Sequence, residues 1–175
     1  MNQLEGKIII VTGGSGLLGS EMIRLLSSRG AIAINFEKTT DTSEDLLNIS
    51  CDITSDKSIK KALYLVMQKY GRIDGLVNNA FPRTKDWGKQ FCDETPAESF
   101  RKNIDMQLNS YAILCQEVLK IMAKQSSGSI INIGSIYGVV GNDFTIYENT
   151  EMMPEAAYAA IKGGIISLTR YLAAF

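Results

Sequence analysis

The sequence predicts an α/β fold of the Rossmann type, with helices on both faces of a doubly wound parallel sheet. Short, apolar and mostly β-branched runs alternate with longer stretches of helical periodicity along the 175 residues, and this alternation is typical of βαβ units. A glycine-rich turn, Thr12–Gly19, joins the first run to the first helix, as it does in dinucleotide-binding folds. We therefore expect residues 1–175 to form a single dinucleotide-binding domain.

The elements follow in order from this pattern. We expect five strands, at residues 7–12, 31–36, 46–51, 73–77 and 129–133. The first of them is almost wholly apolar, as suits a strand buried on both faces. Helices are expected at about residues 17–28, 56–70, 98–124 (one bent helix or two) and from 155 onward. Gly30 and Gly71 are placed to end the first two helices, and Ser55 is placed to cap the second.

Two long polar loops interrupt the alternation. Residues 81–95 follow the fourth strand and residues 135–154 follow the fifth. Loops of this length in a compact domain are usually functional. Both leave the carboxyl ends of strands, where open α/β sheets bind their ligands.

Composition narrows the function classes. A formal net charge of -1 gives no basic surplus for nucleic acid, and no apolar run approaches the ~20 residues of a membrane span. The chain has no histidine, and its three cysteines, Cys51, Cys92 and Cys115, are widely spaced, so no metal site is expected. Unpaired cysteines and the lack of a signal-peptide pattern fit a cytoplasmic protein.

The glycine turn predicts a site for a dinucleotide. Gly13 and Gly16 allow a tight turn close to a pyrophosphate, while Gly19 lets the helix pack on the strand. The amino end of that helix then offers free N–H groups to the phosphates. Glu37 ends the second strand, 18 residues after Gly19, where an acid can bind ribose hydroxyls. A carboxylate there repels a 2′-phosphate, which favours NAD, but the adjacent Lys38 leaves NADP open.

Tyr158 and Lys162 lie four residues apart in a stretch that reads as helix, so their side chains leave the same face. A cation near a phenol favours the phenolate. The pair is therefore a candidate for proton transfer at the substrate.

Together these residues resemble the short-chain dehydrogenase/reductase family, over essentially the whole chain. The matching motifs occur in family order: Thr12-Gly13 with its turn, Cys51-Asp52-Ile53-Thr54, Asn78-Asn79-Ala80, Asn109, Ile131-Asn132-Ile133-Gly134-Ser135, and Tyr158 with Lys162. The resemblance implies an enzyme that transfers a hydride between NAD(P) and a secondary alcohol or ketone, acting on a small molecule. It also implies a homodimer or homotetramer.

The resemblance also implies a role for each matching residue. Tyr158 would be the general acid/base, and Ser135 would hydrogen-bond the substrate oxygen. Lys162 would hold the nicotinamide ribose and favour the phenolate, and Asn109 would hold a water of the proton relay. The cofactor, NAD in the first place, would be bound by Gly13, Ser15, Gly16, Leu17, Leu18, Glu37, Asp52, Ile53, Asn79, Ala80, Tyr158 and Lys162.

Three departures from the family pattern bear on the function. Leu17 stands where many members have glycine, a spacing more like the epimerase and dehydratase branch. Phe81 replaces the glycine that often follows Asn-Asn-Ala. Ser135 and Tyr158 are 23 residues apart, about ten more than usual in the family. The surplus, residues 141–153, is expected over the substrate mouth.

The polar and aromatic side chains of residues 141–153 suit a polyhydroxylated ligand such as a sugar. With Phe81-Pro82-Arg83, this loop is similar to enzymes of bacterial surface-glycan and flagellin-modification clusters. Two other functions stay open. One is a nucleotide-sugar epimerase or dehydratase, and the other is a dinucleotide-binding module without catalysis.

The last helix reaches Phe175 without a closing Gly, Asn or Pro. Members of the family continue with a sixth and a seventh strand. We therefore expect a chain truncated at its carboxyl end, with the C-terminal strands missing.

Overall fold

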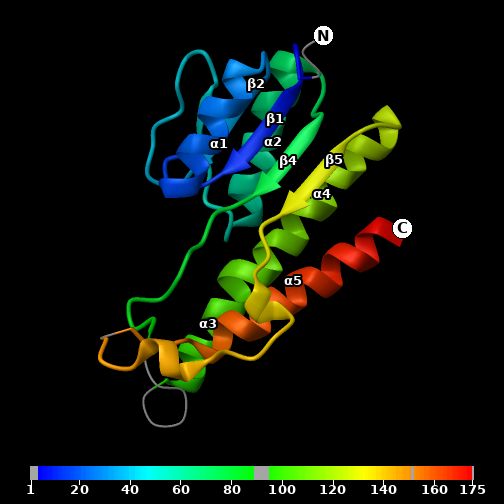
Figure 1. The fold of residues 1–175 in the computed structure, drawn as a ribbon. Coiled ribbons are helices and arrows are strands. Elements are labelled where there is room, and N and C mark those ends of the chain that lie inside the picture. The colour runs from blue at the N-terminus through cyan, green and yellow to red at the C-terminus, as the bar shows by residue number, and fades with distance from the viewer. Residues whose placement is uncertain (1–3, 89–94, 151, 175) are drawn as a thin grey trace. The chain divides into compact units, whose positions relative to one another are not determined.

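A computed structural model describes residues 4–88, 95–150 and 152–174 (Figure 1). Its elements, in chain order, are β1 (Ile8–Thr12), α1 (Leu17–Ser28), β2 (Ile32–Glu37), β3 (Asn48–Ser50), α2 (Asp56–Tyr70), β4 (Gly75–Asn78), α3 (Ala97–Ile104), the π-helix η1 (Asp105–Asn109), α4 (Ser110–Gln125), β5 (Ser129–Asn132), the 3₁₀ helices η2 (Ile136–Gly138) and η3 (Phe144–Tyr147), and α5 (Ala156–Ala174). Cys92 and parts of both expected loops lie outside the described residues.

The described residues form two compact units. The sheet unit comprises residues 4–81 and 111–132, and the helical unit comprises 82–88, 95–110, 133–150 and 152–174. The sheet unit contains the five strands and most of α4. The helical unit contains α3, η1, η2, η3 and α5. The two units carry different parts of the expected chemistry and are described in turn.

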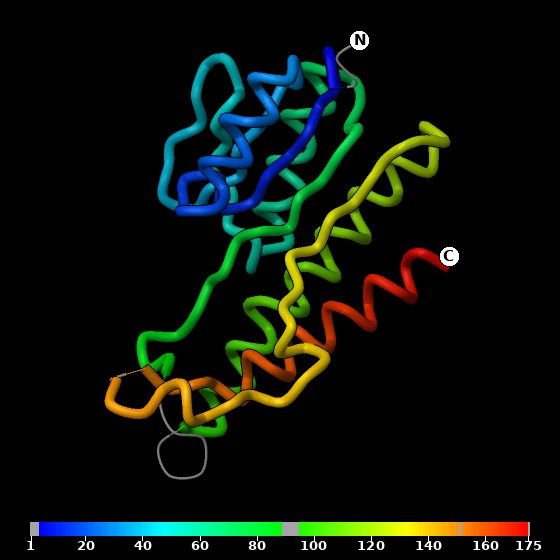
Figure 2. The backbone as a smooth tube through the Cα atoms, in the orientation of Figure 1, coloured from blue at the N-terminus to red at the C-terminus, as the bar shows by residue number. Residues whose placement is uncertain are grey.

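The sheet is parallel throughout, with strand order β3-β2-β1-β4-β5. The expected Rossmann-type α/β class is therefore confirmed for five strands. Figure 2 lets the chain be followed from β1 through α1 to β2. The connection from β3 to β4 runs across the sheet in the opposite direction. Because such crossovers are right-handed, α1 and α2 cover opposite faces.

The sheet unit is built on apolar strand residues. Every residue of β1 is buried, and Ile10 pairs in register with Ile34 on one side and Leu76 on the other. All three side chains have no exposed surface. The apolar run at the start of the chain thus folds as the central strand that its composition predicts.

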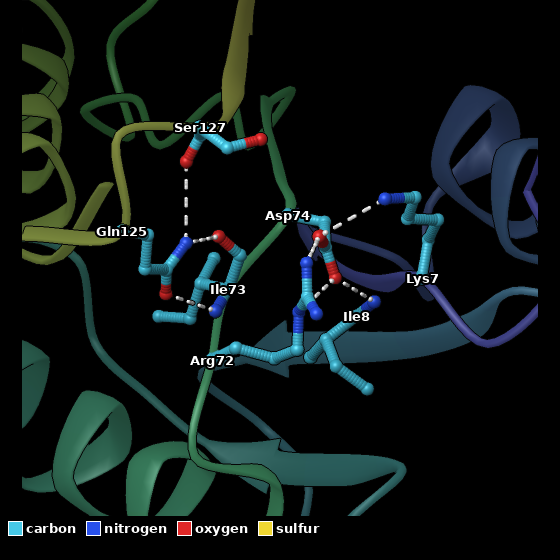
Figure 3. Close-up of polar contacts among 7 residues, drawn as sticks. All are labelled: Lys7, Ile8, Arg72, Ile73, Asp74, Gln125 and Ser127. Atoms are coloured by element: carbon cyan, nitrogen blue, oxygen red, sulfur yellow. Dashed lines mark hydrogen bonds and ion pairs between the residues drawn. The ribbon is translucent and has the colours of Figure 1, made fainter. Parts of the chain in front are cut away.

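A polar cluster fastens the amino ends of the strands (Figure 3). Asp74 accepts hydrogen bonds from the backbone N–H of Ile8 at 2.9 Å and from the guanidinium of Arg72, and its carboxylate lies 3.4 Å from the ammonium of Lys7. Gln125, at the end of α4, pairs with both backbone groups of Ile73 at 3.0 and 2.8 Å. This edge is opposite the carboxyl ends at which ligands bind, so we interpret the cluster as structural.

No helix within the described ranges is long and apolar enough to cross a membrane.

Candidate cofactor-binding and catalytic sites

The glycine turn after β1 is folded tightly against the start of α1. Gly13 has a φ of +66°, in the left-handed region that favours glycine. Its N–H donates to the carbonyl of Phe36 at 2.8 Å, and Gly16 N–H donates back to Gly13 at 3.1 Å. A Cβ on Gly19 would lie 2.2 Å from the carbonyl oxygen of Gly13, so only glycine lets the helix approach the turn this closely.

The amino end of α1 is open to an anion. Its N-cap is Gly16, which has no side chain to accept from the first turn, and that turn carries no acid. The N–H groups of the first turn have no acceptor inside the helix. Leu17 and Leu18, both expected to bind cofactor, are 91% and 58% exposed. The positive end of the helix dipole therefore faces outward at the place expected for a pyrophosphate.

Asn79 and Ala80 lie beside the turn. The buried hydroxyl of Thr12 accepts from both of their backbone N–H groups at 2.9 Å. The side-chain amide of Asn79 donates to the carbonyls of Thr12 and Gly13 at 3.0 and 3.2 Å. The chain after β4 is thereby tied to the chain after β1.

Asn35 was not singled out in the sequence, yet it contacts the turn directly. It lies on β2, is 5% exposed, and bonds through its side chain to Gly14 and Ser15. A polar residue inside an apolar strand was the only signal that could have found it.

Glu37, Lys38 and Asp52 gather at the carboxyl ends of β2 and β3. The carboxylate of Glu37 accepts from the backbone N–H of Lys38 at 2.9 Å. The ammonium of Lys38 lies 2.7 Å from the carboxylate of Asp52, which also accepts from Thr54. Burial alone would raise the pKa of Asp52, but the bonds from Lys38 and Thr54 outweigh it and lower that pKa. The side chain of Ile53, expected near the adenine, is 6% exposed.

Lys162 and Tyr158 lie on α5 in the helical unit. Lys162 is 4% exposed, and its ammonium donates to the carbonyl of Ile133 at 2.6 Å. Burial lowers the pKa of Lys162. The ammonium is 5.6 Å from the centroid of the Tyr158 ring, within cation–π range. The expected pairing on one helix face is therefore present in space.

Ser135 follows β5 and caps η2, its hydroxyl oxygen accepting from the N–H of Tyr137 at 3.2 Å. The next turn packs closely on α5, because a Cβ on Gly138 would lie 2.6 Å from the backbone of Lys162. The helical unit thus contains Ser135, Tyr158 and Lys162 together.

Asn109 is also in the helical unit, but its side chain is exposed and donates to Asp105 at 2.9 Å. Two residues earlier, Gln107 is 1% exposed. Neither side-chain polar atom of Gln107 has a hydrogen-bond partner among the described residues. Both residues belong to the π-helix η1, and such bulges are frequent at functional sites.

Two aromatic residues, Trp87 and Tyr137, lie near Tyr158. The ring of Trp87 meets it edge-on, with 6.4 Å between centroids. A hydrogen bond with Tyr147 raises the pKa of Tyr137, and Asp143 and Tyr158 act on the same phenol with the same sign. Tyr147 belongs to the surplus loop, so this loop contacts Tyr137, a neighbour of Tyr158 within the helical unit.

In the part of the chain that the structure describes, no group of His, Cys, Asp or Glu could hold a metal ion. Burial raises the pKa of Cys51 to about 12 and that of Cys115 to about 11. Both thiols are therefore protonated and poor nucleophiles near neutral pH.

Comparison with known proteins agrees with these features. A family model described as short chain dehydrogenase matches residues 7–174. Post-translational flagellin modification protein A of Campylobacter coli is 36% identical, with 97% of this chain matching 71% of that protein. The 7alpha-hydroxysteroid dehydrogenase of Bacteroides fragilis is 32% identical, over 99% of this chain and 67% of its own.

A solved structure of a short chain dehydrogenase is also similar to this chain. The crystal structure of a short chain dehydrogenase from Leptospira borgpetersenii with bound NAD+ superposes with a TM-score of 0.83 and 32% identity. The match covers 98% of this chain and 66% of that one. The chain thus spans about two thirds of the length of these proteins.

Proposed function

The chain belongs to the short chain dehydrogenase family, and its relatives include a hydroxysteroid dehydrogenase and an NAD+-bound dehydrogenase; we propose that it transfers a hydride between a nicotinamide cofactor and a secondary alcohol or ketone. The narrower likeness to flagellin-modification proteins is confirmed by the relative from Campylobacter coli. The observation that carries the proposal is the buried Lys162 ammonium beside the ring of Tyr158.

The features of the sheet unit fit the diphosphate of NAD. An uncapped helix end, the exposed Ser15 and the tight turn before it form a cradle without a competing acid. Glu37 would accept from the ribose hydroxyls. Lys38 is already paired with Asp52, which supports NAD over NADP. Bound there, the cofactor would supply or accept the hydride.

The residues of the helical unit would handle the proton. During reduction the phenol of Tyr158 donates its proton to the carbonyl oxygen of the substrate, and during oxidation the phenolate accepts it back. Ser135 would donate a hydrogen bond to the same oxygen as charge develops on it. Lys162, held by the carbonyl of Ile133, would favour the phenolate and bind the nicotinamide ribose.

A side-chain amide of the π-helix would hold the water of the proton relay. Asn109 is the residue to which the family resemblance gives this role. The structure offers a second amide, Gln107. This residue is buried, whereas Asn109 is exposed. Variants of Gln107 and Asn109 distinguish the two amides.

A sugar or sugar derivative is the substrate class we propose. Trp87 and Tyr158 meet as an aromatic pair, and Tyr137 bonds to Tyr147 of the surplus loop. Flat aromatic faces with hydroxyl groups at their rims suit a polyhydroxylated ring. The Campylobacter coli relative is a flagellin modification protein, and this name is compatible with a sugar substrate.

The epimerase or dehydratase alternative rests on the spacing of Gly13, Gly16 and Gly19. Against this alternative, the similar proteins include dehydrogenases. A dehydrogenase releases reduced cofactor in step with product, whereas an epimerase recycles it. A screen of sugars, sugar phosphates and nucleotide sugars, followed by absorbance of NADH, separates the two.

Tyr158→Phe tests the catalytic proposal. We expect turnover to fall by about 10²–10⁴-fold, because the general acid/base is lost, while NAD still binds. Tyr171→Phe is the matched control, since Tyr171 lies on the same helix and is 68% exposed. A Tyr158→Phe enzyme that binds NAD and keeps wild-type turnover contradicts the assignment and favours a silent binding module.

We also propose that the protein acts in the cytoplasm as a homodimer or homotetramer. The free, buried Cys51 and Cys115 suit a reducing compartment. Light scattering coupled to size exclusion measures the assembly directly, and a strictly monomeric active enzyme contradicts it.

A further inference from the structure

Asn35 is a polar side chain in an apolar strand. Its neighbours on β2, Ile34 and Phe36, are 0% and 1% exposed, and Asn35 itself is 5% exposed. Burying an amide is costly unless its donors and acceptor are used. In Asn35 the acceptor and one donor form hydrogen bonds with the glycine turn, at Gly14 and Ser15.

The hydrogen bonds fix which way the amide points. Gly14 N–H can only donate, so the atom 2.8 Å away must be the carbonyl oxygen of Asn35. The amide nitrogen then donates to the hydroxyl oxygen of Ser15 and to Asn48 Oδ1, both at 3.1 Å. A Cβ on Gly14 would lie 2.5 Å from Asn35 Oδ1, so turn and amide fit closely.

This orientation of the Asn35 amide leaves the Ser15 hydroxyl as a hydrogen-bond donor. A hydroxyl that accepts from Asn35 keeps its own hydrogen for another partner. Ser15 is exposed and immediately precedes the N-cap of α1. Its O–H is thus presented as a donor beside the free N–H groups of the helix end.

We propose that Asn35 is a positioning residue for the diphosphate of the cofactor, a role that rests on the proposed function. It does not touch the cofactor. It holds Gly14 in place and keeps the Ser15 hydroxyl as an outward donor to a phosphate oxygen.

Asn35→Asp tests this directly. The carboxylate still accepts from Gly14, but it also accepts from Ser15, which turns that hydroxyl inward and places a negative charge near the phosphates. We expect the Kd for ADP-ribose to rise by about tenfold or more, because a hydrogen bond to a charged group is lost. The Kd for adenosine, which has no phosphate, should stay within about twofold.

Isothermal titration calorimetry measures these dissociation constants, and two further variants complete the experiment. Ser15→Ala should reproduce much of the loss, and the effects of Ser15→Ala and Asn35→Asp should not add, since both act through one hydroxyl. Asn48→Ala is the matched control, because exposed Asn48 shares the same amide but does not touch the turn. It should leave the Kd for ADP-ribose nearly unchanged.

The outcomes separate the inference from the proposed function. If the wild-type protein binds ADP-ribose and Asn35→Asp binds it within twofold, Asn35 has no positioning role. An equal loss for adenosine also overturns the inference, because it indicates a general structural role. If Asn35→Asp does not fold, a Ser15→Ala variant with wild-type affinity overturns it. A wild-type protein that binds neither NAD nor ADP-ribose overturns the proposed function as well.

Discussion

At the level of single residues, the π-helix η1 holds two amides in opposite environments. Gln107 is buried without a partner in the described ranges, and Asn109 is exposed and bonded to Asp105. A buried amide normally has a partner, and ordered water is the usual one when protein groups are missing. Gln107 is therefore the better placed of the two to hold a relay water.

We expect Gln107→Leu to lower kcat by about tenfold or more, because a proton relay loses its polar anchor. Asn109→Ala should leave kcat nearly unchanged. Thermal melts control for folding, since leucine in place of an unpaired amide should not destabilise the protein. The opposite pattern, with loss only in Asn109→Ala, would return the relay to the residue expected from the sequence.

Asp74 shows how one carboxylate links stability to pH. Burial would raise its pKa, but the backbone N–H of Ile8 and the cations of Arg72 and Lys7 together lower it. A carboxyl whose pKa is lower in the folded state stabilises the protein above its unfolded pKa of about 3.9. That stability is lost as the pH falls through the lower, folded pKa.

Asp74→Asn should therefore lower the free energy of unfolding at pH 7 by about 1–3 kcal/mol, since charged hydrogen bonds are weakened. The difference from wild type should shrink below about pH 3.9, where the unfolded carboxyl takes up its proton. Urea unfolding at pH 7 and pH 3 measures both. Glu21→Gln, which breaks an exposed pair with Arg24, is the control and should change little.

Among the elements, the contact between α1 and the glycine turn is the most sensitive to substitution. Gly19→Ala places a methyl group against the carbonyl of Gly13. We expect a destabilisation of about 1–3 kcal/mol from overpacking and a weaker affinity for NAD, because the helix end must move. Gly141→Ala, with nothing within 4 Å of the added Cβ, is the control. Unchanged NAD affinity in Gly19→Ala would show that the cradle does not depend on this approach.

Elements set by local chemistry were predicted well. The expected range of α1 matches Leu17–Ser28, and Ser55 and Gly71 bound α2 as expected, with Ser55 accepting from Ser58 and Gly71 left-handed. Capping depends on neighbouring residues, so it is visible in the sequence. The third strand is shorter than expected, Asn48–Ser50 instead of 46–51. Leu46 has a φ of +54°, which a strand cannot contain.

Features that depend on distant residues were not predicted. The range 98–124 was expected as one bent helix or two, and the structure divides it with a π-helix. The spacing of Tyr158 and Lys162 is local and could be recognised. The contact of Asn35 with Gly14 spans 21 residues, and that of Lys162 with Ile133 spans 29. Such contacts follow from the packing of elements, which a single sequence does not specify.

For the whole molecule, cofactor choice should be visible as a change in stability. A ligand that binds only the folded state stabilises it by about 2.7 kcal/mol at a hundred times its Kd. For a chain of this size each kcal/mol raises Tm by roughly 2–4 °C. Saturating NAD should therefore raise Tm by several degrees, whether or not a substrate is known.

NADP should raise Tm less than NAD at equal concentration. The carboxylate of Glu37 repels a 2′-phosphate, and the cation that could attract one, Lys38, is paired with Asp52 at 2.7 Å. Glu37→Gln removes the repulsion and should narrow the difference between the two cofactors, while Glu44→Gln, on the exposed surface of the same unit, should not. If NADP stabilises the wild-type protein more than NAD does, the prediction is wrong. Lys38 then binds the 2′-phosphate in place of Asp52, and Lys38 instead of Glu37 determines the cofactor preference.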